Sequence, residues 1–211
     1  MKQLSIITLV LTAFLLASNT GCNPESIEPV VDADVTEVSE DEDLGLAYMR
    51  EEEKLARDVY ITLFGMYDNQ VFDNISKAEQ RHMDQVLTIL EKYNLPDPAL
   101  PNIGEFENDI LQELYNDLIA QGSESETEAL LVGATIEDLD IYDLANFTLE
   151  TADQDIIKLY DALACGSRNH MRAFIFQLDS LEVTYTPQFI AQEELDSIVA
   201  GDHERCGQGG N

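Results

Sequence analysis

Apolar residues recur at intervals of three and four along most of the chain, the spacing that places them on one side of an α-helix. Shorter helical patterns begin at Phe106 and after Pro187, and no segment of useful length alternates as a strand does. The long segments with this pattern lie at about residues 43–64, 75–93, 124–147 and 151–181. Four long amphipathic helices, with a long connection between the second and third, predict an all-α four-helix bundle.

The two shorter patterns add detail to this bundle. The one from Phe106 to Gly122 predicts a short extra helix in the connection between the second and third long helices, and the one after Pro187 predicts a short C-terminal helix. Asn94 and the prolines that follow it end the second long helix, because proline cannot continue a helix. Thr151 is expected to cap the fourth long helix.

The first 21 residues differ from the helical domain in composition. Lys2 gives a positive start, residues 4–17 are almost wholly apolar, and Gly21 and Cys22 follow shortly after. This layout predicts a secretory signal peptide over residues 1–21, and its apolar run is too short to span a bilayer comfortably. The Gly21-Cys22 junction resembles a bacterial lipoprotein cleavage point, which predicts a lipid on Cys22 and a location in the periplasm or at the outer membrane. Secretion after ordinary cleavage nearby is the alternative.

Three further segments follow from composition. Residues 22–42 are acidic, contain Pro24 and Pro29, and show no helical period, which predicts a solvated tether between the lipid and the domain. The helical domain is predicted over residues 43–200. The glycine-rich end, residues 201–211, is expected to be a flexible tail.

The chain is strongly acidic, with 42 acidic against 11 basic residues and a net charge of −31 at pH 7. A polyanionic surface repels nucleic acid and anionic lipid headgroups, so we expect neither as a partner, and membrane contact only through the N-terminal lipid. The same surface attracts cations, including divalent metal ions. Solubility alone is an alternative reason for the charge.

Cys165 and Cys206 remain if Cys22 carries a lipid. Two cysteines in an exported protein could form a disulfide, which here would join the tail to the last long helix. The sequence does not establish whether their separation suits a bridge, so the pairing stays open.

The second long helix carries the clearest candidate ligands. Glu79 and His82 stand three residues apart, so both side chains leave the same side of the helix, and His82 stands four residues before the apolar Val86. A carboxylate and an imidazole within one turn suit iron, manganese or zinc. Alternatively, Ser76 and Glu79 have capping-box spacing, and Glu79 would then close the start of the helix.

Three successive glutamates stand on the first long helix. Glu52 and Glu53 are both well placed to face the core, whereas a favourable position near the helix N-terminus is enough to explain Glu51. Only one or two of the three can face the core, so the pattern alone leaves both Glu52 and Glu53 as candidate ligands.

The third and fourth long helices carry candidates at comparable positions. Glu137 and Asp140 share the apolar side of the third helix, whereas Asp138 and Asp143 are expected to be solvated. His170 lies on the apolar side of the fourth, where a histidine bonded to a carbonyl is the structural alternative. Charges on buried faces are costly unless they are paired or bound to metal. Four helices that bring acids and imidazoles to one core predict a dinuclear metal site.

Several strings resemble known ferritin-like proteins. The string from Glu53 to Tyr60, EKLARDVY, resembles the first-helix signature of rubrerythrins, in which a glutamate precedes Ala-Arg and a tyrosine. EQRH at 79–82 is similar to their second-helix Glu-x-x-His, and EDLD at 137–140 resembles their third-helix pair of acids. With AEQRHM and GSRNHMRAF, the chain most resembles the ferritin-like family called domain of unknown function 2202, over about residues 43–182.

The resemblance implies a ferritin-like four-helix bundle that holds two iron ions, or manganese or zinc. Residue by residue, it implies a ligand set of Glu53, Glu79, His82, Glu137, His170 and, as an additional acid, Asp140. The chain departs from the rubrerythrin pattern at Ser167, three residues before His170, where that pattern has a glutamate. The departure leaves a dinuclear, a mononuclear and a vestigial site open.

Related sites use two metal ions to activate oxygen or peroxide, so the implied activity is peroxide reduction or ferrous oxidation. Rubrerythrins also carry a separate cysteine-ligated iron domain, but this sequence has no Cys-x-x-Cys spacing, which leaves the electron donor unaccounted for. The alternative is a non-catalytic ferritin-like binding or interaction module of the cell envelope with a vestigial metal site. In that case arginines would neutralise the acids, the candidates being Arg57, Arg81, Arg168 and Arg172.

Overall fold

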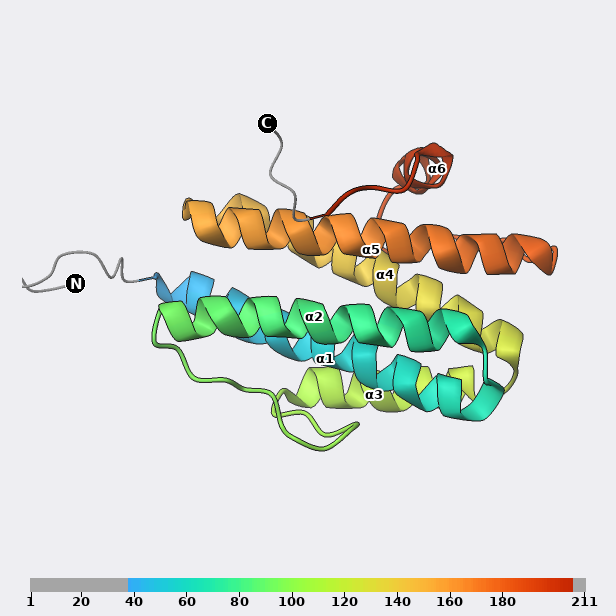
Figure 1. Cartoon of the computed structure of the whole chain (residues 1–211), viewed down its shortest axis with the longest axis horizontal. Coiled ribbons are helices and arrows are strands. Elements are labelled where there is room, and N and C mark those ends of the chain that lie inside the picture. The colour runs from blue at the N-terminus through green and yellow to red at the C-terminus, as the bar shows by residue number, and fades with distance from the viewer. Residues whose placement is uncertain (1–37, 207–211) are drawn as a thin grey trace, which may run out of the picture. The chain divides into compact units, whose positions relative to one another are not determined.

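The computed structural model describes residues 38–206, within which the chain forms six helices and no strand (Figure 1). The helices are α1 (Glu40–Tyr67), α2 (Gln70–Lys92), α3 (Asp109–Gly122), α4 (Glu126–Glu150), α5 (Gln154–Ser180) and α6 (Gln192–Ala200). The predicted all-α bundle is confirmed, with α3 as the extra helix in the connection and α6 as the C-terminal one. None of the described helices has both the length and the apolar character needed to cross a bilayer. The predicted signal peptide, the lipidation site Cys22 and most of the tether lie outside the described residues.

The four long helices pack as two antiparallel pairs, α1 with α2 and α4 with α5 (Figure 1). Only Asp68 and Asn69 separate α1 from α2, and a link of similar length separates α4 from α5, so each pair must reverse direction. α3 lies against both α1 and α4, and α6 lies against α5. The seam between α2 and α5 is less extensive than the contact within either pair.

α1 begins at Glu40, slightly earlier than the sequence indicates, because Ser39 caps it. The Ser39 hydroxyl accepts a hydrogen bond from the backbone N–H of Glu42, and the Glu42 carboxylate accepts one from the backbone N–H of Ser39 at 2.9 Å. This reciprocal pair is a capping box, and it satisfies two N–H groups that the helix itself cannot. The last residues assigned to the tether therefore belong to the bundle.

α2 begins at Gln70, about one turn before the predicted start. Asn69 caps it, with a side-chain oxygen that accepts from the backbone N–H two residues on. Ser76 lies inside the helix, and its hydroxyl donates to the carbonyl of Asp73 at 2.9 Å. The capping-box interpretation of Glu79 is therefore wrong, and this carboxylate is free for another role.

α5 is capped by Asp153 and not, as predicted, by Thr151. The Asp153 carboxylate accepts from the backbone N–H groups of Asp155 and Ile156. Thr151 instead donates its hydroxyl hydrogen to Glu42, which ties the link between α4 and α5 to the first turn of α1.

The core consists of two apolar clusters with a polar layer between them along the four long helices. One cluster lies toward the α1–α2 connection and includes Val59, Leu63, Phe72, Ala129 and Phe174. The other lies toward the opposite end and includes Leu46, Met49, Val86, Leu90 and Leu163. The buried polar side chains between the clusters are Glu52, Glu53, Glu79, His82, Glu137, Asp140 and Ser167.

The segment after α6 lies along α5, where the sequence predicts a flexible tail. A disulfide joins Cys206 to Cys165 on α5, with the two Cα atoms 5.5 Å apart. Glu204 binds two arginines of α5, with 2.5 Å to Arg168 and 2.7 Å to Arg172. These contacts hold the chain to α5 as far as the end of the described residues.

Candidate metal centre

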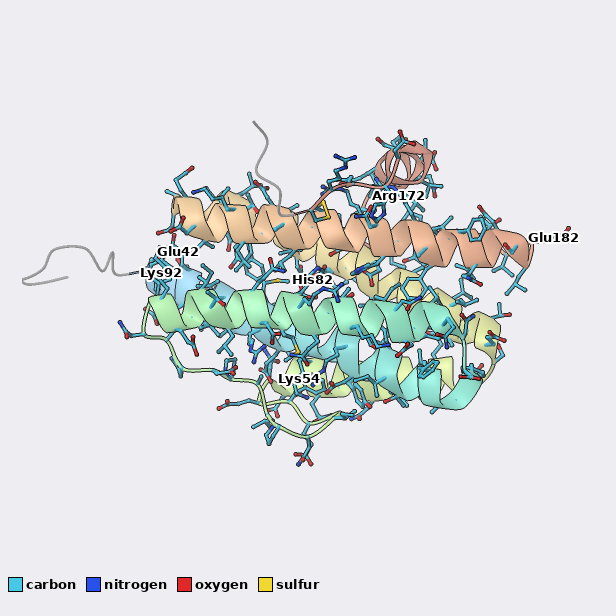
Figure 2. All side chains as sticks on the ribbon, viewed as in Figure 1. Glu42, Lys54, His82, Lys92, Arg172 and Glu182 are labelled. Carbon is cyan, nitrogen blue, oxygen red and sulfur yellow. A yellow bond between two sulfur atoms is a disulfide. The ribbon has the colours of Figure 1, made fainter. Side chains whose placement is uncertain are left out.

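The side chains of five predicted ligands meet in the polar layer. α1 supplies Glu53, α2 supplies Glu79 and His82, α4 supplies Glu137, and α5 supplies His170. Figure 2 places His82 between α2 and α5. At most 12% of any of these five side chains is exposed. Four helices thus bring three acids and two imidazoles to one buried point.

Glu79 lies between the two histidines. Its Oε2 atom is 2.8 Å from Nδ1 of His82, and its Oε1 atom is 2.8 Å from Nδ1 of His170. The two imidazole rings are stacked, with their centroids 5.5 Å apart. One carboxylate therefore contacts two ligand nitrogens from different helices, one with each oxygen.

Each histidine also faces a second carboxylate. Oε2 of Glu53 is 3.2 Å from Nδ1 of His82, and Oε2 of Glu137 is 3.4 Å from Nδ1 of His170. The result is two groups of three residues, each with ligand atoms within 4.8 Å of one another, and Glu79 belongs to both. The arrangement has the form of two adjacent metal positions with a shared carboxylate.

The acids and imidazoles of this cluster change one another's pKa values. Burial lowers the pKa of His170, but the carboxylates of Glu79 and Glu137 outweigh burial and raise this pKa to about 10. Burial likewise opposes a charge on His82, yet Glu53 and Glu79 raise its pKa well above the usual value. Burial raises the pKa of Glu79, but the two imidazolium groups hold it below its usual range. Protons on the histidines thus balance the acids, and a metal cation can replace those protons.

The two outer carboxylates differ in their surroundings. Burial raises the pKa of Glu53 to about 7, although His82 acts in the opposite direction. Burial also raises the pKa of Glu137, and the hydroxyl of Tyr60 donates to its Oε1 at 2.5 Å. Burial raises the pKa of Tyr60 well above its usual value, so this hydroxyl keeps its proton and remains a donor. Tyr60 therefore fixes the position of Glu137 in the site.

The residues present fit a pair of metal ions. Within residues 38–206, Oε1 of Glu53 has no hydrogen-bond partner, and Nδ1 of His170 is close to Glu79 without the alignment of a hydrogen bond. Buried polar atoms without a partner are costly, because folding removes them from water. A cation between these atoms would satisfy them. Carboxylate and imidazole donors together suit iron, manganese and zinc.

Asp140, the sixth predicted ligand, belongs to neither group of three. Its Oδ2 accepts a hydrogen bond from the hydroxyl of Ser167, the residue at the position where the rubrerythrin pattern has glutamate. Its Oδ1 has no partner among the described residues. Burial, with the charges of Glu53 and Glu137, raises the pKa of Asp140 well above its usual value, which favours the neutral acid. The structure thus brings five of the six residues together and leaves Asp140 beside them.

Glu52 is buried next to the centre but on a different side from Glu53. Within the described chain neither of its oxygens makes a well-aligned hydrogen bond. Burial raises the pKa of Glu52 well above its usual value, and the nearby charges of Asp140 and the half-buried Asp143 raise it further. Two neighbouring glutamates that are equally well placed in the sequence therefore differ in the structure, where only Glu53 contacts a histidine.

Two other acids hold chain segments in place. Asp138, expected to be solvated, is fully buried and accepts hydrogen bonds from the backbone N–H groups of residues 188–190. Glu51 accepts from the backbone N–H groups of Glu107, at 2.6 Å, and Asn108, at 3.1 Å. The expectation for Asp138 is wrong because its partners come from a segment about fifty residues away, which no local pattern reveals.

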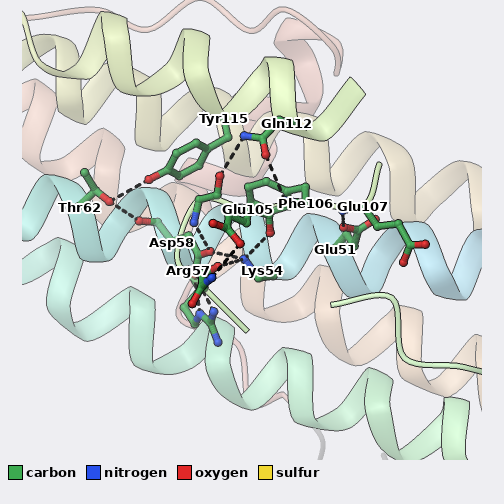
Figure 3. A network of polar contacts seen from close by, with 12 residues as sticks. Glu51, Lys54, Arg57, Asp58, Thr62, Glu105, Phe106, Glu107, Gln112 and Tyr115 are labelled. Atoms are coloured by element: carbon green, nitrogen blue, oxygen red, sulfur yellow. Dashed lines mark hydrogen bonds and ion pairs between the residues drawn. The ribbon is translucent and has the colours of Figure 1, made fainter. Parts of the chain in front are cut away.

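A buried ion pair on α1, which the sequence analysis did not predict, binds the loop between α2 and α3 (Figure 3). Nζ of Lys54 is 2.5 Å from Oδ2 of Asp58, and neither side chain is exposed. Lys54 also donates to the carbonyls of Asn102 and Glu105, while Asp58 accepts from the backbone N–H of Gly104. The pair therefore fastens the loop between α2 and α3 to α1. The i, i+4 spacing of opposite charges was the available signal.

The arginines considered as partners for the acids lie elsewhere. Arg57 pairs with Asp58 at 2.7 Å, and Arg81 donates to a backbone carbonyl of its own helix. Arg168 and Arg172 both bind the carboxylate that follows α6. Within residues 38–206 none of these arginines forms an ion pair with the five clustered ligands, so arginine neutralisation does not explain the buried acids.

A cavity of about 640 Å³ lies along the seam between α2 and α5, and both His82 and His170 line it. Gly166 of α5 and Cys206 of the C-terminal segment also line it. A Cβ atom added to Gly166 would lie 2.4 Å from both Cε1 and Nε2 of His82, so only glycine leaves room for this ring. The imidazole side of the candidate centre therefore borders this cavity.

Comparison with known proteins agrees with the resemblance inferred from the sequence. The family model described as uncharacterized protein domain DUF2202 matches residues 42–202. The uncharacterized protein MJ0754 of Methanocaldococcus jannaschii is 52% identical over 169 residues, which cover 80% of this chain and 91% of the relative. The crystal structure of hypothetical protein MJ0754 from Methanococcus jannaschii DSM 2661 has a TM-score of 0.78 and 51% identity, and the match covers 79% of this chain and 96% of that chain. The chain therefore belongs to the DUF2202 family.

Proposed function

We propose that this protein binds two metal ions in the polar layer of its bundle, with iron as the expected metal, and uses them in peroxide reduction or ferrous oxidation. One observation carries the proposal: Glu79 presents one oxygen to His82 and the other to His170, each at 2.8 Å. A carboxylate shared in this way between two ligand groups suits two ions held side by side. Manganese and zinc suit the same donors.

Each residue of the cluster has a distinct part in this proposal. Glu53 and His82 would hold one ion, Glu137 and His170 would hold the other, and Glu79 would bind both. A bound ferrous pair supplies two electrons, the number needed to reduce one peroxide to water.

The surrounding residues prepare the site for this chemistry. Tyr60 holds Glu137 through a hydrogen bond of 2.5 Å, so this ligand is oriented before any ion arrives. The apolar clusters on both sides keep water away from the polar layer along the helix axes. The cavity at His82 and His170 admits a small oxidant from the seam between α2 and α5.

Anaerobic loading with ferrous iron tests the proposal. The protein is incubated with ferrous salt, freed of excess metal by gel filtration and analysed for iron, and we expect about two ions per chain. Glu79→Gln should lose bound iron, whereas Glu91→Gln, the same change at an exposed position of α2, should keep it. A wild-type protein that binds no iron, manganese or zinc, and whose melting temperature none of them changes, would contradict the proposal.

The two candidate reactions are separated by the oxidant. Ferrous-loaded protein is mixed anaerobically with one equivalent of peroxide, or in a second experiment with oxygenated buffer, and ferric absorbance is followed. Faster oxidation by peroxide identifies peroxide reduction, and faster oxidation by oxygen identifies ferrous oxidation. Equal rates for the wild type and Glu79→Gln with both oxidants would show that the site catalyses neither.

We also propose that the protein is exported and held at the bacterial cell envelope by a lipid on Cys22. The support is the N-terminal sequence, which precedes the family match at residue 42. Mass analysis of the mature protein should show loss of residues 1–21 and a lipid on Cys22, and Cys22→Ser should release the protein from the membrane fraction. A mature chain with an unmodified Cys22 would overturn the anchor.

A further inference from the structure

We infer that Cys165 and Cys206 form a redox-active pair that returns electrons to the metal centre, an inference that rests on the function proposed above. Their disulfide joins α5 to the C-terminal segment, as Figure 2 shows. Cys206 lines the same cavity of about 640 Å³ as His82 and His170. Cys206 and the two candidate imidazole ligands therefore border one space, and the disulfide places Cys165 next to it.

Gly166 connects Cys165 to His82. It follows Cys165 directly in α5, and a Cβ added to it would be 2.4 Å from Cε1 and Nε2 of the His82 ring. Nδ1 of the same ring lies 2.8 Å from Oε2 of Glu79. One peptide unit and one van der Waals contact thus separate Cys165 from a candidate metal ligand, which is a short path for electrons.

Contacts other than the disulfide hold the C-terminal segment in position. The Glu204 carboxylate binds Arg168 at 2.5 Å and Arg172 at 2.7 Å. The backbone N–H of Glu204 donates to Oδ1 of Asn169 at 2.9 Å, and Nδ2 of Asn169 donates to the backbone carbonyl of Glu204 at 3.1 Å. Cys206 therefore stays beside α5 when the S–S bond is broken, and the high effective concentration of its thiol favours re-formation of the bond.

The two sulfur atoms differ in access to solvent. Cys206 is exposed, whereas 9% of Cys165 is exposed. A thiolate of an external dithiol can attack the sulfur of Cys206, which breaks the S–S bond and releases Cys165 as a thiolate. The second thiol of the reductant then attacks the mixed disulfide and frees Cys206, and the reductant leaves as its own disulfide. Nδ2 of Asn169, 3.3 Å from Sγ of Cys206, can donate to the freed thiolate.

Electrons and protons balance when electrons pass from the two thiols to the metal centre. The two thiols lose two protons and two electrons as their S–S bond forms, and the two electrons convert two ferric ions to ferrous ions. With peroxide as the final oxidant, the O–O bond breaks and two electrons and two protons complete two water molecules. A dithiol then restores the cysteine pair. This cycle supplies the electron donor that the sequence, without a Cys-x-x-Cys iron domain, leaves unaccounted for.

A single-turnover experiment on the full chain tests the inference through the state of the cysteines. The protein is reduced with dithiothreitol, freed of reductant, loaded anaerobically with ferrous iron and treated with one equivalent of peroxide. The sample is then alkylated for mass analysis, and its ferrous iron is measured with a chelator. We expect one new disulfide per peroxide and full recovery of ferrous iron. In Cys165→Ser/Cys206→Ser we expect unchanged iron loading and ferric iron at the end.

Zinc-loaded wild type provides a comparison that depends on no variant. Zinc does not change oxidation state. The thiols of the zinc-loaded protein should therefore remain open to alkylation over the time in which the iron-loaded protein forms its disulfide. Equal disulfide formation with zinc would mean that peroxide attacks the thiols directly and would overturn the inference. Ferric iron with both wild-type thiols intact would also overturn it while leaving the metal site standing. Failure to bind iron at all would overturn both proposals.

Discussion

Nδ1 of His170 on α5 lies 2.8 Å from Oε1 of Glu79 on α2. The contact between these two helices is less extensive than the contact within either antiparallel pair. Above and below this contact the helices pack through apolar side chains. The buried carboxylate and imidazole interrupt that apolar packing. The other oxygen of Glu79 makes the same contact with His82. Glu79 therefore connects the two halves of the candidate centre.

Removal of the Tyr60 hydroxyl should weaken metal binding. Tyr60→Phe takes away the donor to Glu137, and loss of such an outer partner lowers metal affinity by roughly 10–100-fold. The free energy of unfolding of the metal-free protein should fall by about 1 kcal/mol for the lost hydrogen bond. Calorimetric titration with manganese measures the affinity. The exposed Tyr142→Phe on α4 is the control, and equal affinities for the two variants would refute the role of Tyr60.

Metal uptake should release protons. The pKa of His170 is raised to about 10 and that of His82 also lies well above its usual value, so both imidazoles are protonated at pH 7 before metal binds. Coordination needs neutral imidazole, and Glu53, whose pKa is about 7, must also be deprotonated. We therefore expect at least two protons released per chain at pH 7 and an affinity that rises with pH up to about 10. The stability of the metal-free protein has the opposite dependence on pH. The raised pKa of His170 stabilises the fold fully at pH values below the pKa of this histidine in the unfolded chain, and this stabilisation is lost as pH rises through about 10. Calorimetry in buffers of different ionisation enthalpy counts the protons, and a count of zero would contradict this scheme.

A methyl group at Gly166 should disturb the centre. The added Cβ would be 2.4 Å from the His82 ring, and contacts with Glu53 and Glu79 keep that ring from moving aside. We expect Gly166→Ala to cost about 1–3 kcal/mol in unfolding free energy despite alanine's better helix propensity, and to lower metal affinity. Gly65→Ala on α1 meets nothing within 4 Å and should stabilise by about 0.5–1 kcal/mol. Urea denaturation of both variants provides the test, and matching shifts would rule out the close contact.

The buried ion pair on α1 should contribute far more than its exposed counterpart. Lys54→Met leaves the fully buried Asp58 without its lysine and frees two loop carbonyls, so we expect a loss of about 3–5 kcal/mol. Lys77→Met breaks a pair of the same i, i+4 geometry with Asp73, but 64% of the Lys77 side chain is exposed, and we expect a change within about 0.5 kcal/mol. Thermal and urea unfolding measure both. Similar losses of unfolding free energy in the two variants would mean that burial does not determine how much the Lys54–Asp58 pair stabilises the protein.

The sequence was sufficient for the parts of the site that helical spacing determines. Glu79 and His82 are one turn apart on α2, and His170 lies on the apolar side of α5, so their convergence could be predicted. Helical spacing does not decide between the adjacent Glu52 and Glu53, because both positions border the apolar side; the resemblance of EKLARDVY to the rubrerythrin signature indicated Glu53, which is the one that contacts His82.

Contacts between distant segments were beyond the reach of local patterns. Asp138 is buried because residues 188–190 present three backbone N–H groups to it, and Ser167 pairs with Asp140 across two helices. The start of α2 at Gln70 is not evident from the sequence, because Asn69 lies in a polar stretch where several residues could cap a helix. These features depend on the tertiary packing of the chain and not on the spacing of residues within one element.

The two proposed metal positions can be seen in a crystal of the protein that is soaked anaerobically in ferrous or manganous salt and examined by an anomalous difference map at the metal edge. We expect two peaks, one between Glu53, Glu79 and His82 and the other between Glu79, Glu137 and His170, with the Glu79 carboxylate next to both. A map with no peak in the polar layer, or with metal only on the acidic surface, would contradict this expectation.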